Sequence, residues 1–135
     1  MLKKQNAWMR MFALFFLVVS CALAYPQRGP RSVFLGRASV DGRLDHDTIP
    51  VGKGAGPLRA IQLRVVGGTV EFHRVVVRYG NGTAEVLRVN SVIPSGGQTR
   101  PIGLAGNRRA IRSVDLWYGK AHWRTRPIVS LFGIR

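Results

Sequence analysis

The chain has 135 residues, with 21 Lys and Arg against six Asp and Glu, which gives a formal net charge of +15. This length predicts one domain, and the single cysteine, Cys21, excludes an internal disulfide and a cysteine-rich zinc site. The excess of positive charge favours acidic partners, such as an anionic glycan, a lipid headgroup surface or a nucleic acid.

The first 24 residues have the pattern of a secretory signal peptide. Three basic residues precede an apolar run over residues 11–24, and Ala22-Leu23-Ala24 matches an A-x-A cleavage site. The run is shorter than the roughly 20 residues that a membrane-spanning helix requires, and no later segment is long and apolar enough to span a bilayer. We therefore expect an exported protein, periplasmic or extracellular, whose mature chain begins at Tyr25 and has no transmembrane span.

Cys21 offers an alternative to simple cleavage. Val18-Val19-Ser20-Cys21 resembles the lipobox of bacterial lipoproteins, in which the cysteine is acylated and anchors the protein to a membrane. We favour simple cleavage, because no flexible Gly/Ser tether follows Cys21 and the apolar run continues to Ala24. Cleavage would remove three of the 21 basic residues and leave 18 against six acids, a net charge of +12.

Residues 25–32 are a proline-containing basic lead-in, and residues 33–135 are expected to form a single β domain. In this domain, glycines and prolines separate short runs in which apolar residues alternate with polar ones, the pattern of half-buried strands. The expected strands, in chain order, are residues 33–40, 46–51, 60–66, 69–79, 84–92, 100–104, 113–118 and 128–134. Pro50 predicts an edge position for the second, because proline lacks the N–H that a central strand donates.

Several local signals predict how these strands are joined. Gly67-Gly68 predicts a two-residue hairpin loop, and Asn81-Gly82 predicts a second hairpin with a type I′ turn. The alternation of strand 69–79 changes phase, and a bulge near His73–Arg74 would restore one apolar face. Ile111 is out of phase with the strand that follows it, which predicts that this strand begins after Ile111.

About eight short strands with frequent turn signals predict an all-β, antiparallel β-sandwich. A small barrel is the alternative architecture. No βαβ alternation is present, so a parallel sheet is not expected.

The pattern resembles an uncharacterised family of small exported bacterial β-rich proteins, a domain of unknown function. The resemblance covers nearly all of residues 32–135, and it implies export and a β fold but no activity. The motifs that carry it are Leu35-Gly36, Asp45-x-Asp47-x-Ile49, Ile61-x-Leu63-x-Val65-x-Gly67, Val75-x-Val77-x-Tyr79, Asn81-Gly82, Arg100-x-Ile102-x-Leu104-x-Gly106, Arg109-x-Ile111 and Val114 to Tyr118.

Three of the six acids, Asp41, Asp45 and Asp47, fall within one short segment, and oxygen-rich clusters bind metal ions such as Ca²⁺. The spacing does not match an EF-hand loop, so a turn with carboxylates neutralised by nearby arginines is the preferred interpretation. His46 lies between two of these acids and could act as an oriented base. No cofactor is predicted.

Residues 106–126 combine basic and aromatic side chains, and Trp117 is expected to point outward from its strand. Guanidinium groups pair with phosphate, sulfate or carboxylate, while aromatic faces stack on bases or sugar rings. The alternative is that the arginines are only solvated and Trp123 folds back over the edge of the core. The candidate ligand-binding residues are Arg108, Arg109, Arg112, Trp117, Lys120, His122, Trp123, Arg124 and Arg126.

These features favour a non-catalytic exported domain that binds an anionic glycan or lipid surface through the basic and aromatic residues. A nucleic-acid ligand is not expected outside the cell. The first alternative is a structural or assembly protein of the cell envelope, which would contact a protein partner. The second alternative is a small hydrolase that uses Asp45, His46 and Asp47. No pattern of base, acid and nucleophile supports catalysis more strongly, so an enzyme is not the preferred interpretation.

Overall fold

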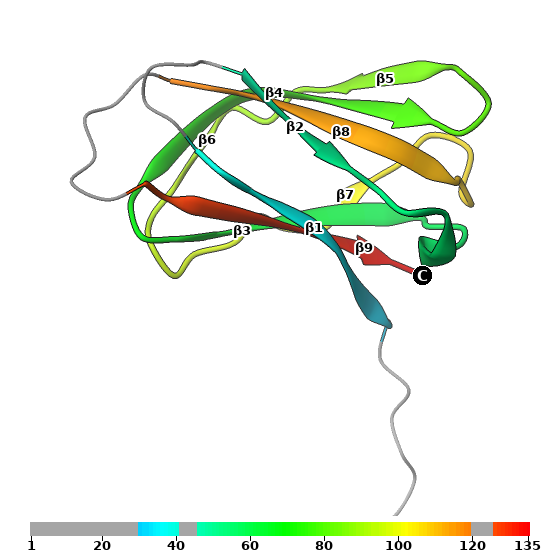
Figure 1. Ribbon diagram of the computed structural model, residues 1–135, viewed down its shortest axis with the longest axis horizontal. Helices are drawn as coiled ribbons and strands as arrows, with labels where there is room; N and C mark the ends of the chain where they lie inside the picture. Colours follow the sequence, from blue (N-terminus) through cyan, green and yellow to red (C-terminus); the bar gives the residue numbers. More distant parts are fainter. Residues whose placement is uncertain (1–29, 41–45, 120–125) are drawn as a thin grey trace, which may run out of the picture.

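Two antiparallel β-sheets pack face to face (Figure 1). The computed structural model describes residues 30–40, 46–119 and 126–135. Within these ranges a short 3₁₀ turn, η1 (Lys53–Ala55), follows the second strand. The strands are β1 (Ser32–Ser39), β2 (His46–Pro50), β3 (Ala60–Val66), β4 (Val70–Tyr79), β5 (Ala84–Leu87), β6 (Ser91–Ile93), β7 (Ile102–Gly103), β8 (Ile111–Tyr118) and β9 (Ile128–Ile134).

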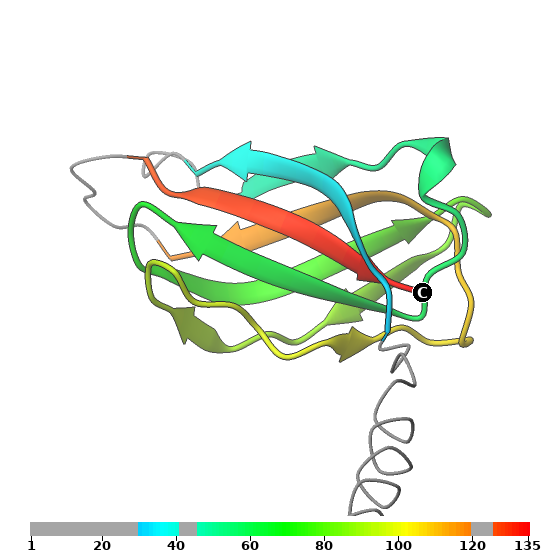
Figure 2. The ribbon, with the colours of Figure 1, turned by 90° about the horizontal axis from the view of Figure 1, so that it is seen from below.

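One sheet has the strand order β1-β9-β3-β7 and the other has the order β2-β8-β4-β5, with β6 also pairing with β4. Figure 2 shows the first sheet from below, with β9 between β1 and β3. The sheets do not close into a barrel, so the expected antiparallel sandwich is confirmed and the barrel alternative is wrong. β2 is an edge strand, as Pro50 predicts.

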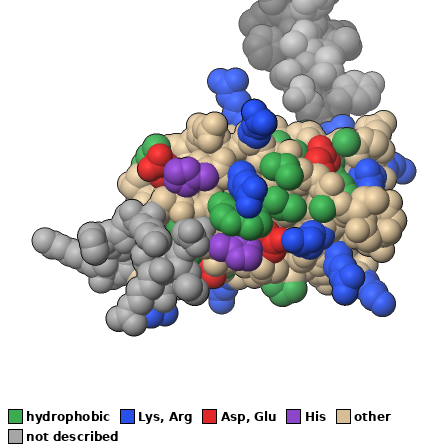
Figure 3. Space-filling model, turned by 90° about the horizontal axis from the view of Figure 1, so that it is seen from above, with side chains coloured by type: hydrophobic (Ala, Val, Ile, Leu, Met, Phe, Trp, Pro, Cys, Tyr) green, Lys and Arg blue, Asp and Glu red, His purple; other side chains and the backbone are tan. Residues whose placement is uncertain are grey.

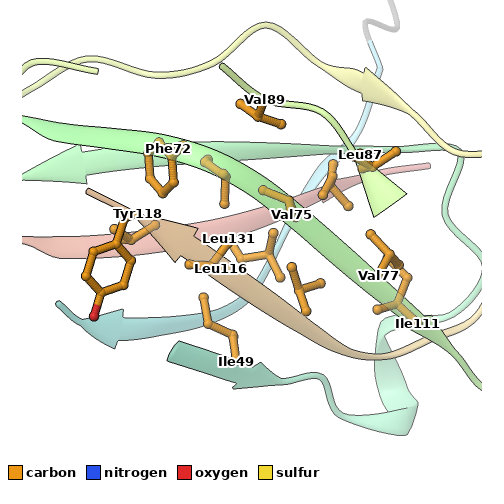
Figure 4. Packing of buried hydrophobic residues seen from close by; sticks show 14 of the residues in the cluster. Ile49, Phe72, Val75, Val77, Leu87, Val89, Ile111, Leu116, Tyr118 and Leu131 are labelled. Carbon is orange, nitrogen blue, oxygen red and sulfur yellow. The ribbon is translucent and has the colours of Figure 1, made fainter. Parts of the chain in front are cut away.

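The core lies between the two sheets and is formed by alternate residues of the strands. Phe72, Val75, Leu116 and Tyr118 point inward from one sheet and meet Leu131 of the other (Figure 4). All five side chains are buried. Burying one large apolar side chain contributes roughly 1.5–3 kcal/mol, so this inner layer is the main source of stability in a domain whose described part contains no cysteine.

A β-bulge sits in β4, where the change of phase predicted it. Phe72 pairs with Tyr118 and Arg74 pairs with Trp117, which leaves His73 as the inserted residue. The bulge keeps Phe72 on the inner face while it places Arg74 on the outer face.

A second bulge, in β8, was not predicted. Arg78 pairs with Ser113 and Tyr79 pairs with Ile111, so Arg112 is inserted between them. Ile111 is therefore buried at the start of β8, and the prediction that this strand begins after Ile111 is wrong. Because Arg112 is inserted, Ile111 and Val114 both face the core although they are three positions apart. The sequence alone does not show that Arg112 is the inserted residue.

The predicted hairpin at Gly67-Gly68 is also wrong. β3 pairs with β9 and β7, whereas β4 pairs with β8, β5 and β6, so the chain crosses from one sheet to the other between β3 and β4. Gly67 has a φ of +86°, a conformation that glycine adopts readily, and it redirects the chain at this crossing.

The second predicted hairpin, between β4 and β5, is confirmed, but its turn type differs. The Tyr79 N–H donates to the Thr83 carbonyl at 2.9 Å, and the Gly82 N–H donates to the Tyr79 carbonyl at 3.1 Å. Gly82 has a φ of +88°, while Asn81 is not in the positive-φ region that a type I′ turn requires at both central residues. The loop therefore has three residues and a single left-handed position.

The expected strands 84–92 and 100–104 are shorter in the structure. The first is divided into β5 and β6, and the second is reduced to β7. The chain before β7 instead runs beside β3, where the Val65 N–H donates to the Gly97 carbonyl at 3.0 Å and the Thr99 N–H donates to the Leu63 carbonyl at 2.8 Å. β5 and β6 form the free margin of one sheet. β7 and the chain before it form the free margin of the other sheet, on the same side of the sandwich.

Close packing of Leu58 and Leu35 against β9 predicts a strong difference between two glycines of the same sheet. A Cβ at Gly133 would lie 2.7 Å from both terminal methyl carbons of the buried Leu58 and 3.1 Å from Leu35, whereas a Cβ at Gly103 would meet nothing within 4 Å. We expect Gly133→Ala to lower the free energy of unfolding by about 1–3 kcal/mol through overpacking. Urea unfolding followed by circular dichroism measures this, with Gly103→Ala as the near-neutral control. Equal effects of the two substitutions would contradict the packing described here.

Candidate functional site

An aromatic and basic row crosses the outer face of the β2–β8–β4 sheet. His46, Trp117 and Arg74 are neighbours in register on three adjacent strands. The imidazole of His46 stacks on the indole with a centroid separation of 4.3 Å and an interplanar angle of 19°, and the Arg74 Cζ lies 4.2 Å from the indole centroid. Because β2 and β4 flank β8 on opposite sides, the two groups cover opposite faces of the ring.

The local sequence explains why these side chains meet. His46 begins β2, and the inserted His73 sets the phase of β4 so that Arg74 shares a face with Trp117. Figure 3 shows this outer face, on which hydrophobic side chains are bordered by basic side chains and by histidine. The row is held together by ring stacking and by a cation–π contact.

A buried carboxylate lies beside the row on the same outer face. Asp115 is 4% exposed. Its Oδ1 accepts a hydrogen bond from the Thr48 hydroxyl at 2.6 Å, and its Oδ2 accepts one from the Arg78 Nε at 2.9 Å. The Nε2 of His46 lies 3.7 Å from Oδ1. Asp115 therefore ties β2 and β4 to the central strand β8.

The surroundings of Asp115 favour its ionised form. Burial of the carboxyl opposes ionisation, but the hydrogen bonds from Thr48 and Arg78, together with the positive charge of Arg78, hold the pKa of Asp115 below its ordinary value. The carboxylate in turn neutralises part of the charge of Arg78, whose side chain remains 54% exposed.

The structure separates the predicted ligand-binding residues into two groups. Arg108 and Arg109 lie just before β8 and Arg112 lies near its start, whereas Trp117 lies near its end. At about 3.3 Å per residue, Arg112 and Trp117 are on the order of 16 Å apart along the strand. Arg126 is exposed just before β9. The remaining predicted residues, Lys120, His122, Trp123 and Arg124, lie outside the described residues.

Arg109 has a structural role at the β4–β5 turn. Its Cζ lies 3.8 Å from the centroid of the Tyr79 ring, and its guanidinium group donates to the Ala105 carbonyl at 3.1 Å and to the Thr83 hydroxyl at 3.2 Å. The Tyr79 hydroxyl donates to the Glu85 carboxylate. Burial and this hydrogen bond raise the pKa of Tyr79. Arg109 is thus held by its neighbours at the turn.

The predicted acidic cluster is only partly described. Asp47 accepts a hydrogen bond from the Tyr118 hydroxyl at 2.7 Å. Asp41 and Asp45 lie outside the described residues, as does Cys21. His46 and Asp47 are adjacent in β2 and therefore point to opposite faces of the sheet. The described ranges hold no group of three or more His, Cys, Asp or Glu side chains able to bind a metal ion.

Within the described part of the domain, many cationic side chains have no partner. Arg64 covers the Phe132 ring at 4.0 Å, Arg74 covers Trp117, and Arg78 pairs with Asp115. Other cationic side chains make no hydrogen bond, ion pair or ring contact within the described residues. These are Arg31, Arg37, Lys53, Arg59, Arg88, Arg100, Arg108 and Arg112. Their charge is available to a ligand from outside the domain.

Sequence reasoning missed Thr48, Arg74, Arg78 and Asp115 as members of the site. Their alternation with buried residues places each on an outer face, and the phase change in β4 signals the position of Arg74. β2, β8 and β4 are far apart in the sequence, and their pairing brings these residues together. No local sequence pattern predicts which distant strands pair.

The lowered pKa of Asp115 predicts an acid-sensitive contribution to stability. Because the pKa is lower in the folded state, ionised Asp115 stabilises the fold fully above the unfolded value of about 3.9, and this stabilisation is lost as the pH falls through the folded pKa. We expect Asp115→Asn to lower the free energy of unfolding by about 1–3 kcal/mol at neutral pH.

Urea unfolding of both proteins from pH 7 to pH 2 measures this difference. The difference in unfolding free energy between the two proteins should shrink progressively below about pH 4, because protonation of Asp115 removes from the wild-type protein the charge that the variant lacks. Glu71→Gln is the control, since Glu71 is exposed and its side chain has no partner among the described residues. A difference for Asp115→Asn that is constant over the whole pH range would contradict the ionic role.

None of the described segments is a helix long and apolar enough to cross a membrane. No curated protein matches the chain.

Among solved structures, the chain is similar to AlgX of Pseudomonas aeruginosa, with a TM-score of 0.56 and 14% sequence identity over 80% of this chain. It spans only 27% of that structure's chain, and the likeness is one of fold. The family model for a domain of unknown function, DUF2541, matches residues 10–133, and the chain belongs to this family.

Proposed function

We propose that this chain is an exported, non-catalytic domain that binds an anionic ligand, either an acidic glycan or an anionic lipid surface. The observation that carries the proposal is the excess of exposed cationic side chains, of which Arg74 and Arg78 lie on one face beside Trp117. Folding leaves these charges exposed, and a polyanion would neutralise several of them at once. The signal-like pattern of residues 1–24 supports export, which disfavours nucleic acid as the ligand.

The outer face around Trp117 is the preferred binding surface. Arg74 lies over the indole and the Arg78 Nε donates to Asp115, while both arginine side chains remain exposed to solvent. Immobilising a long side chain on binding costs roughly 0.5–1.5 kcal/mol, and these two arginines incur less of that cost. Their planar guanidinium groups match the geometry of carboxylate, sulfate or phosphate.

The expected stacking of a ligand on Trp117 needs revision. Both faces of the indole are covered, one by His46 and the other by Arg74. A sugar ring therefore has access to the outer side of His46, whose side chain is 42% exposed, rather than to the indole itself. In this proposal Trp117 orients the two groups that contact the ligand.

The hydrogen-bond pattern supports a role without catalysis. In a nucleophile–base–acid arrangement, the hydroxyl would donate to the imidazole and the imidazole to the carboxylate. Here the Thr48 hydroxyl donates directly to Asp115, and His46 approaches the same oxygen from 3.7 Å. The carboxylate therefore holds Thr48 in place without a base to activate it.

Binding to dextran sulfate, phosphatidylglycerol vesicles and double-stranded DNA, measured over a series of salt concentrations, tests this proposal. We expect binding to the sulfated glycan or the vesicles to weaken steeply as salt rises, because bound counterions compete with the arginines. Arg74→Gln should weaken it about three- to tenfold. The matched control is Arg37→Gln, which removes one exposed charge from β1 in the other sheet.

Two results would contradict the proposal. Affinity that is independent of salt would exclude binding driven by charge, and equal losses for Arg74→Gln and Arg37→Gln would exclude the Trp117 face as the binding surface. Self-association that depends on protein concentration and is unaffected by polyanion would instead favour the structural or assembly role.

A further inference from the structure

A groove of about 680 Å³ runs along one side of the sandwich, and its lining includes none of His46, Arg74 and Trp117. One wall is formed by residues 88–93, which include β6 and the break that precedes it. The other wall is formed by residues 98–100 and Ile102, which lie along β3 and lead into β7. The groove therefore lies between the free margins of the two sheets.

Both margins present strand edges. Among the described strands, β6 pairs with β4 alone and β7 pairs with β3 alone. A strand that is paired on one side leaves alternate N–H and C=O groups directed away from its neighbour. An extended backbone placed in the groove could form a ladder with these groups, as in recognition by strand addition.

The side chains of the groove define the charge of its occupant. Arg88 and Arg100 come from opposite walls, and neither makes a hydrogen bond, ion pair or ring contact within the described residues. No Asp or Glu is among the lining residues. Two unpaired guanidinium groups without a nearby acid favour carboxylates in the occupant.

The remaining lining combines polar and apolar groups. Asn90 and Gln98 supply amides, while Val92, which is 61% exposed, and the half-buried Ile102 supply apolar surface. The lining contains no aromatic ring that could stack on a sugar. An extended peptide that carries both acidic and apolar side chains matches this surface, because each wall of the groove presents one arginine and one of these apolar side chains.

We propose that the groove binds an extended acidic segment of a partner protein, which adds as a strand along β6. The carboxylates of the segment pair with Arg88 and Arg100, and its apolar side chains pack on Val92 and Ile102. The lead-in of this chain, residues 25–32, does not fit as the occupant, because it carries two arginines and no acid. This site is separate from the Trp117 face and does not depend on the ligand proposed there.

Fluorescence anisotropy with a labelled peptide of four Asp-Val pairs tests the groove. We expect the double variant Arg88→Gln/Arg100→Gln to weaken binding at least about tenfold, because two charge-assisted hydrogen bonds are lost. Arg37→Gln/Arg59→Gln is the matched control, since it removes two exposed, unpartnered charges elsewhere and should leave peptide binding within about twofold. Arg74→Gln should also leave it unchanged, which separates this site from the Trp117 face.

A second peptide, methylated on alternate backbone nitrogens, tests strand addition, because it cannot form one side of the ladder. We expect it to bind at least about tenfold more weakly than the unmodified peptide. Equal binding of the two peptides, or equal binding by the groove variant and the wild-type protein, would overturn the proposal. A loss of dextran sulfate binding in the groove variant without loss of peptide binding would assign the groove to a glycan instead.

Discussion

One inserted residue in β4 sets the two faces of the sheet that carries the candidate site. With His73 inserted opposite β8, Phe72 stays in the core and Arg74 moves to the outer face beside Trp117. Without that insertion, the alternation of the strand would carry either Phe72 or Val75 out of the core. The hydrophobic layer and the arginine row are therefore consequences of the same backbone irregularity.

The arginines of the domain fall into two structural classes. Some arginines are used within the fold, such as Arg109 at the β4–β5 turn and Arg78 beside Asp115. Others, such as Arg88 and Arg100, have no partner within the described residues. Net charge alone does not distinguish these two classes, because a guanidinium group that covers a tyrosine ring counts the same as one that lines the groove.

Two surfaces with different chemistry follow from this arrangement. The Trp117 face offers guanidinium groups that are already oriented by an aromatic ring and a buried carboxylate. The groove between the sheet margins offers unpaired arginines beside free strand edges. The first surface is the one proposed for a repeating anionic ligand, and the second is the one proposed for an extended acidic peptide.

The sequence by itself determined the all-β class, the approximate strands, the edge position of β2 and the bulge near His73, because alternation, Pro50 and a change of phase are local signals. Only the tertiary structure decided that the chain crosses between sheets at Gly67, that Arg112 is inserted in β8, and that His46 and Arg74 enclose Trp117. Each of these depends on which distant strands pair. That choice is made by the packing of the whole core, and no short stretch of residues encodes it.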